Sequence, residues 1–103
     1  MTTNIGWELY RSFLSVLKEG SLSGAARVLG ITQPTVGRHI AALEQALGVA
    51  LFTRSQLGLT PTETALGLRT YAETMESTAA SLERAATASG EGVRGVPGSL
   101  EER

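Results

Sequence analysis

Hydrophobic side chains repeat at helical spacing along the first third of the chain, and glycines separate the repeats. Two helices are predicted there, one from Trp7 to Glu19 and one between Ser21 and Gly30. The apolar positions of the first helix, spaced i, i+3, i+4 and i+7, are Tyr10, Phe13, Leu14 and Leu17. The shorter apolar face of the second helix consists of Ala25, Ala26, Val28 and Leu29. Because Gly20 follows the first helix and Gly30 the second, where helices commonly end, we expect a sharp turn at both places.

A third amphipathic helix is predicted from about Gln33 to Leu47. Thr32 can cap its start, and Pro34 is tolerated in a first helical turn. At 100° per residue the apolar side chains fall within an arc of about 60°. These side chains are Val36, Ile40, Leu43 and Leu47. We therefore expect one narrow side of this helix to be buried and the opposite side, which carries Arg38, to be exposed.

A small β-hairpin is predicted after the third helix. Two β-prone runs, 49–54 and 59–60, flank a turn that contains Gly58. Such short strands are not stable alone, so the hairpin must pack against the helices.

Thr60-Pro61-Thr62-Glu63 predicts the start of a long helix. Thr60 would be the N-cap, Pro61 the first helical residue and Glu63 the partner that completes a capping box. Apolar residues in this helix recur at alternating steps of three and four. This seam consists of Ala65, Leu68, Ala72, Met75, Ala79, Leu82 and Ala86. A heptad seam is typical of helices that pair with other helices. A second copy of the chain is the simplest partner, and folding of the seam back onto the first helix is the alternative.

The pattern predicts a mainly α fold in three parts. Residues 1–60 would form one domain, residues 61–89 a linker or dimerisation helix, and residues 90–103 a flexible tail rich in glycine.

Composition restricts the chemistry that the chain can perform. The 103 residues include ten acidic residues, all of them Glu, a single histidine (His39) and no cysteine. A structural zinc site and the usual nucleophilic triads therefore lack their parts, and we expect no metal, no cofactor and no enzyme activity. His39 is expected to be a half-buried packing residue or a phosphate contact. No apolar run is long enough to span a membrane and the start lacks the regions of a signal peptide, which predicts a cytoplasmic protein.

Charge is distributed unevenly along the chain. The formal net charge is −1, with five basic and three acidic residues in positions 1–60 and four basic and seven acidic residues in positions 61–103. The first part is therefore weakly positive. Charge alone permits nucleic-acid binding there without favouring it.

The spacing around Gly30 favours a helix-turn-helix. Ala26 stands four positions before this glycine and Val36 six positions after it. A small residue permits close helix contact, the glycine allows the turn, and an apolar residue locks the third helix onto its partner. Three helices followed by a hairpin would make a winged helix-turn-helix.

Several short motifs together form the basis of a family resemblance. They are Phe13-Leu14, Gly20-Ser21-Leu22, Ala25-Ala26, Leu29, Thr32-Gln33-Pro34-Thr35-Val36-Gly37-Arg38, Leu43-Glu44, Leu47-Gly48, Leu51-Phe52, Arg54 and Thr60-Pro61-Thr62-Glu63. In these motifs the chain, over about residues 5–95, resembles the amino-terminal DNA-binding region of LysR-type transcriptional regulators.

The resemblance implies more than the residue pattern alone. It implies a winged helix-turn-helix followed by a linker helix that pairs antiparallel with its twin, and hence a homodimer on an imperfectly palindromic DNA operator. It also implies a two-lobed domain for a small-molecule effector after a segment like Gly92-Val93-Arg94-Gly95, and such a domain is not contained in these 103 residues.

Nine residues are the expected DNA contacts: Ser23, Arg27, Thr32, Gln33, Pro34, Thr35, Gly37, Arg38 and Arg54. Gln33 can pair with an adenine edge, Arg38 can bind guanine or a phosphate, and Thr35 can contact a thymine methyl or a phosphate. At Gly37, where many family members carry serine, the backbone can come close to DNA.

The remaining expected contacts lie around the third helix. Ser23 and Thr32 can either cap a helix or bind phosphate at a helix start, and Arg27 is a plausible phosphate contact. Arg54 in the wing suits a minor groove. The rest of the wing is less basic than in the family.

A second hypothesis from another functional class remains open at this point. The low charge and the weakly basic wing favour a protein-interaction or dimerisation module that has the winged-helix fold and does not read DNA.

Overall fold

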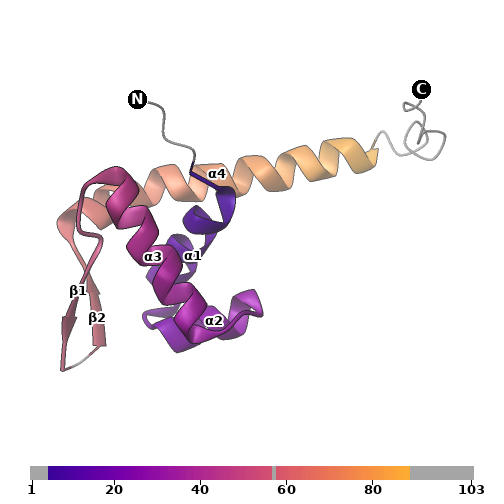
Figure 1. The fold of residues 1–103 in the computed structure, drawn as a ribbon. Coiled ribbons are helices and arrows are strands. Elements are labelled where there is room, and N and C mark those ends of the chain that lie inside the picture. The colour runs from indigo at the N-terminus through magenta and orange to yellow at the C-terminus, as the bar shows by residue number, and fades with distance from the viewer. Residues whose placement is uncertain (1–4, 57, 89–103) are drawn as a thin grey trace. The chain divides into compact units, whose positions relative to one another are not determined.

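The structure, a computed structural model, describes residues 5–56 and 58–88 of the chain. Within these residues four helices and a two-stranded hairpin follow one another along the chain (Figure 1). Their bounds are Trp7–Glu19 for α1, Leu22–Leu29 for α2, Gln33–Leu47 for α3, Phe52–Ser55 for β1, Gly58–Pro61 for β2 and Glu63–Ala88 for α4. The mainly α class, with three helices and a hairpin before a long helix, is confirmed. The predicted tail, residues 90–103, lies outside the described residues.

Glycines end the first three helices, as predicted for the first two. Gly20, Gly30 and Gly48 take φ values of 80°, 73° and 74°, and the amide of each donates a hydrogen bond to the carbonyl four residues earlier. This left-handed conformation is costly for residues with a Cβ. At the other ends, the side chains of Ser21 and Thr32 accept hydrogen bonds from the amides of Gly24 and Thr35, which confirms the predicted cap at Thr32 and makes Ser21 the cap of α2.

Two glycines allow a matched test of backbone strain. Around both Gly30 and Gly67 an added Cβ would meet no atom within 4 Å, but only Gly30 has a positive φ. We expect Gly30→Ala to destabilise the fold by about 1–2 kcal/mol and Gly67→Ala, inside α4, to stabilise it by up to about 1 kcal/mol. Urea unfolding followed by circular dichroism at one protein concentration measures both. Equal effects of the same sign would contradict the assignment of strain to Gly30.

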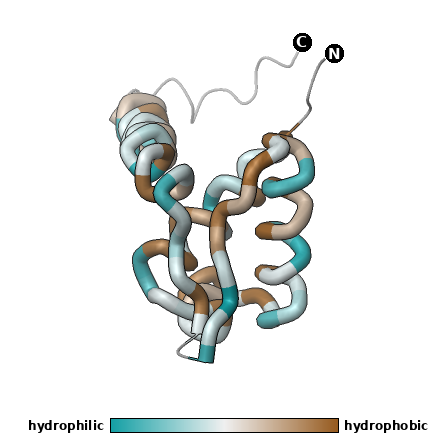
Figure 2. The backbone as a smooth tube through the Cα atoms, turned by 90° about the vertical axis from the view of Figure 1, so that its left-hand side faces the viewer, coloured by the Kyte–Doolittle hydropathy of each residue, from teal (hydrophilic) through white to brown (hydrophobic). Residues whose placement is uncertain are grey.

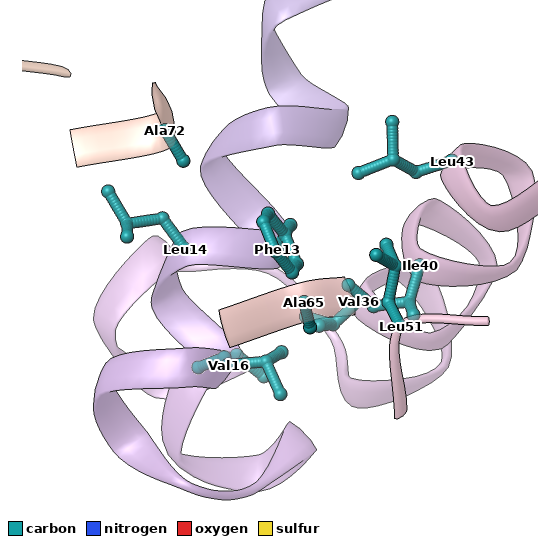
Figure 3. Close-up of a cluster of buried hydrophobic side chains, with 11 residues drawn as sticks. Phe13, Leu14, Val16, Val36, Ile40, Leu43, Leu51, Ala65 and Ala72 are labelled. Carbon is teal, nitrogen blue, oxygen red and sulfur yellow. The ribbon is translucent and has the colours of Figure 1, made fainter. Parts of the chain in front are cut away.

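The helices α1, α2 and α3 together are called the helix-turn-helix unit. The hydrophobic core lies among these three helices and the start of the hairpin (Figure 3). Hydrophobic and hydrophilic residues alternate along the helices (Figure 2). Phe13 and Leu14 of α1 are buried, as are Val36, Ile40 and Leu43 of α3. The predicted apolar faces are thus confirmed for these positions.

Two positions of those apolar faces differ from the prediction. Val28 is 61% exposed, because at 100° per residue it lies about 160° from the buried Ala26 around α2. Leu47 is 39% exposed, because the buried positions of α3 end at Leu43, one turn earlier.

The first turns of α4 belong to this core. Ala65 and Ala72 are buried in it, and Leu68 packs against it (Figure 3). Among the described residues, the first compact unit accordingly extends to residue 73, and residues 74–88 belong to a second unit. The boundary predicted at residue 60 therefore falls inside the first unit.

The seam of α4 needs a corresponding correction. Ala65, Leu68 and Ala72 were predicted as contacts with a partner helix, but Ala65 and Ala72 are buried in the chain's own core and Leu68 is partly buried against it. The period of the seam does not by itself determine which surface covers it. Only Met75, Ala79, Leu82 and Ala86 remain available to a partner, with Leu82 67% exposed.

The start of α4 also differs from the prediction. The helix begins at Glu63, and the Oγ1 atom of Thr62 accepts a hydrogen bond from the amide of Ala65 at 3.1 Å. Thr62, rather than Thr60, is therefore the capping residue. Pro61 lies at the end of β2, opposite Phe52 of β1, and Thr60 pairs with Thr53. Strand pairing thus takes the two residues that the capping-box prediction had assigned to the helix start.

Candidate nucleic-acid interface

A tight turn joins α2 to α3. The amides of Gly30 and Ile31 both donate hydrogen bonds to the carbonyl of Ala26, at 2.8 and 3.1 Å. Ala26 and Val36 are buried on the two sides of this turn, as the helix-turn-helix spacing predicts. Gly24 is also buried, and a Cβ there would lie 2.9 Å from the Glu19 side chain, so α2 begins in close contact with the end of α1.

The first turns of α3 carry a row of hydrogen-bonded polar side chains. The hydroxyl oxygens of Thr32 and Thr35 lie 2.8 Å apart, and the Thr35 amide donates to Thr32 Oγ1 at 3.3 Å. The Nη2 group of Arg38 donates to Thr35 Oγ1 at 3.1 Å. The row therefore restrains the guanidinium group along the exposed side of α3, opposite the buried stripe of Val36.

The other predicted contacts on α3 are accessible to different degrees. Gln33, Pro34 and Arg38 are exposed, while Thr35 and Gly37 are half-buried. A Cβ built at Gly37 would meet only Leu22 Cδ1, at 3.8 Å. The site would therefore accept serine, and the glycine leaves the backbone open to a close neighbour.

A shallow hollow lies between the start of α2, the start of α3 and the hairpin, with a volume of about 230 Å³. Its lining consists of Ser21, Leu22, Ser23, Gln33, Arg54, Ser55, Gly58 and Leu59. The hollow brings together three predicted contacts, Ser23, Gln33 and Arg54. Arg27 and Arg38 do not line it. Hydroxyl groups and an arginine beside a helix N-terminus suit an anionic phosphate.

Three arginines of this surface lie exposed on α2, α3 and β1. In the part of the chain that the structure describes, Arg27, Arg38 and Arg54 are exposed and none takes part in an ion pair. The ion pair between Arg69 and Glu73 lies instead on α4, at 3.0 Å. Three unpaired guanidinium groups from α2, α3 and β1 thus give the helix-turn-helix unit a local positive charge despite the net charge of −1.

His39 joins α3 to α1. Its Nδ1 atom lies 2.6 Å from the hydroxyl oxygen of Ser12, which is buried in α1. His39 itself is half-buried, in line with the packing role expected for it. Ser12 gave no sequence signal, because a serine on the buried side of a helix is recognisable only once its partner is known.

Glu44 is a contact that the pattern did not reveal. Its side chain on α3 accepts hydrogen bonds from the backbone amides of Leu51 and Phe52, where the hairpin begins. The only signal was its position within the Leu43-Glu44 family motif.

Two features of the described residues bear on other functions. No three histidine, cysteine, aspartate or glutamate side chains among residues 5–56 and 58–88 come together in a group able to hold a metal ion. Over the same residues, every helix is too short or too polar to cross a membrane.

Comparison with known proteins adds a family match. Residues 7–66 match the family model described as "Bacterial regulatory helix-turn-helix protein, lysR family". A relative in Stutzerimonas stutzeri, the "Putative HTH-type transcriptional regulator protein PtxE", is 42% identical over 62 residues, which are 60% of this chain and 32% of that protein. The chain therefore spans about a third of the length of this relative.

Solved structures match the fold as well. "Corynebacterium glutamicum OxyR C206S mutant, H2O2-bound" superposes with a TM-score of 0.80 and 27% identity, over 84% of this chain and 28% of that one. "Crystal structure of CbnR_DBD-DNA complex" superposes with a TM-score of 0.74 and 27% identity, over 82% of this chain and 98% of that one.

Proposed function

Because the chain belongs to the lysR family of bacterial regulatory helix-turn-helix proteins, we propose that it binds duplex DNA sequence-specifically as the DNA-binding domain of a transcriptional regulator. The observation that carries this proposal is the Thr32–Thr35–Arg38 row on the exposed side of α3, opposite a stripe buried in the core. The likeness to a domain solved in complex with DNA supports it. The family is one of regulators, not of enzymes.

The side chains at the start of α3 would read base edges in the major groove. Gln33 offers an amide for adenine, and Arg38 offers a two-pronged donor for guanine. Thr35 would contact a thymine methyl group or a phosphate while it holds Arg38. Pro34 and Gly37 add little bulk at the helix surface, so the backbone can approach the DNA.

The surrounding residues would bind the DNA backbone. Ser23 and Arg54 line the hollow beside the start of α2 and suit a phosphate there. Arg27 and Thr32 would contact phosphates on either side of the turn. From β1, Arg54 would also reach the adjacent minor groove, where arginine is favoured.

The homodimer is the second part of the proposal. Met75, Ala79, Leu82 and Ala86 continue the heptad seam beyond its buried part, and at helical spacing they share one side of α4. A second copy of the chain would cover them, and the dimer would bind an imperfect palindrome. In a longer protein, a further domain would bind a small-molecule effector. The regulator would act in the cytoplasm, where bacterial DNA is accessible.

A charge introduced into this seam tests the dimer. We expect Leu82→Glu to raise the dimer dissociation constant by about 10- to 100-fold, because pairing would bury a carboxylate without a partner. Ser81→Glu is the matched control, since it adds the same charge at an exposed position beside Arg84. Sedimentation equilibrium of the 103-residue chain measures both. A dimer that Leu82→Glu leaves unchanged would show that the seam lies elsewhere.

Selection of bound fragments from genomic DNA tests the function itself. The chain should enrich a repeated half-site in inverted orientation, with centres separated by about one helical turn or a multiple of it. The alternative, an interaction module with the same fold, predicts no enriched sequence at any salt concentration. The low charge of the chain favours that alternative, and this experiment separates the two.

A further inference from the structure

The hairpin is attached to α3 by one carboxylate. The Oε2 atom of Glu44 accepts hydrogen bonds from the amides of Leu51, at 2.8 Å, and Phe52, at 3.3 Å. The amide of Leu51 precedes β1 and that of Phe52 begins it. A single oxygen of the α3 side chain therefore fixes the backbone at the point where the hairpin begins.

The same backbone segment is held from its other side by the start of α4. The amide of Thr62 donates to the carbonyl of Leu51 at 2.9 Å, and Thr62 Oγ1 donates to the carbonyl of Ala50 at 2.8 Å. The side chain of Leu51 is 0% exposed. The donors of the segment thus face α3 and its acceptors face α4, with its side chain anchored in the core.

We propose that Glu44 is a positioning residue for DNA binding, which sets the place of the wing arginine Arg54 relative to Arg38 on α3. This inference rests on the proposed function. Arg54 lies two residues after Phe52, on a strand of only four residues. Its position therefore depends on how the start of that strand is held.

Besides the hydrogen bonds of Glu44 and Thr62, two apolar contacts attach the hairpin to the unit. The rings of Phe13 and Phe52 meet edge to face with centroids 5.9 Å apart, and Leu51 fills the core. Both are apolar contacts that fix the base of the hairpin without directing its backbone amides. Loss of the Glu44 carboxylate would leave the hairpin attached, but its two amides would lack their directional partner.

A double-mutant cycle on the 103-residue chain tests this role. The probe is a duplex that the parent chain selects, and fluorescence anisotropy gives the dissociation constant. In the parent, Arg54→Ala should weaken binding by about tenfold; in the Glu44→Ala background it should weaken binding by less than about twofold, because a misplaced arginine contributes little. Losses of equal size in the two backgrounds would overturn the proposal.

Two further variants test whether the effect depends on the acceptor oxygen of Glu44 or only on its charge. Glu44→Gln keeps an acceptor oxygen in place and should restore most of the Arg54 effect; a glutamine that behaves like alanine would overturn the proposal. If Glu44→Ala does not fold, Glu44→Asp takes its place, because it keeps the charge but draws the acceptor oxygen back from the two amides; the Arg54 effect must shrink there as well. Glu73→Ala is the charge control, because it removes an exposed carboxylate on α4 and should leave the Arg54 effect unchanged.

Amide hydrogen exchange without DNA separates this inference from the proposed function. Glu44→Ala should speed exchange at the amides of Leu51 and Phe52, and Glu73→Ala should not. Unchanged exchange would overturn the positioning role whatever the DNA result. A parent chain that selects no DNA would overturn the proposed function, and the role of Glu44 in binding with it, even where the exchange result shows that Glu44 holds the hairpin.

Discussion

Replacement of Arg38 by alanine is expected to weaken binding to the selected duplex by about 1–3 kcal/mol, which is about 5- to 150-fold in the dissociation constant. The guanidinium group is exposed, carries no ion pair within the described residues and is restrained by Thr35 at 3.1 Å. It is thus oriented before DNA arrives, so little side-chain freedom is lost on binding. A two-pronged donor contact with one guanine would be lost in the variant.

The control separates base recognition from charge. Arg84→Ala removes the same charge from α4, where Arg84 donates to Ser81 at 3.1 Å, and we expect it to leave the affinity nearly unchanged. Anisotropy titrations give the dissociation constants for the selected duplex and for a scrambled duplex. Arg38→Ala should bring these two dissociation constants closer together. Sedimentation must show an intact dimer. A loss that is equal on both duplexes would make Arg38 a phosphate contact, and an unchanged affinity would refute the proposed interface.

The first three helices were predictable because their signals are local. Each helix ends at a glycine with positive φ, and the two caps at Ser21 and Thr32 lie next to the helices that they begin. Such features need no knowledge of distant residues. The exposed side of α3 followed from the same periodicity, since burial of Val36 and Ile40 leaves Arg38 outside.

The errors arise where two distant segments compete for the same residues. Thr60 and Pro61 have good capping chemistry, but they pair with β1, and the cap passes to Thr62. The α4 seam shows the same limitation. Ala65 and Ala72 have the period of a helix-pairing seam, and this chain's own core covers them. Local sequence encodes which side of a helix is apolar, but not which surface covers it.

The candidate site also combines features that local sequence predicts with features that depend on packing. Which residues are exposed on α3 follows from its period, whereas the hollow that joins Ser23, Gln33 and Arg54 depends on how three elements pack. The contacts of Glu44 span seven and eight residues and end on backbone amides, which carry no sequence signal. That these residues contact DNA stays a prediction.

Among the variants proposed here for this chain, Leu51→Ala is expected to lose the most stability, about 2–5 kcal/mol in the free energy of unfolding. The side chain is 0% exposed and belongs to the cluster that also contains Val36 and Leu43 (Figure 3). Truncation removes apolar contacts and leaves a cavity at the junction of α3, the hairpin and α4. Because small domains have only about 5–15 kcal/mol of stability in total, the variant should unfold at a much lower urea concentration.

Leu66→Ala provides the matched control, because it makes the same truncation on α4 at a side chain that is 50% exposed. We expect a change within about 0.5 kcal/mol for this surface position. Urea unfolding at one fixed protein concentration removes the effect of dimerisation from the comparison. Equal losses in the two variants would place Leu51 outside the core. Glu44 and Thr62 form hydrogen bonds with the backbone around Leu51. Hydrogen exchange at the amides of residues 51 and 52 in folded Leu51→Ala therefore shows whether these hydrogen bonds persist without the buried leucine side chain.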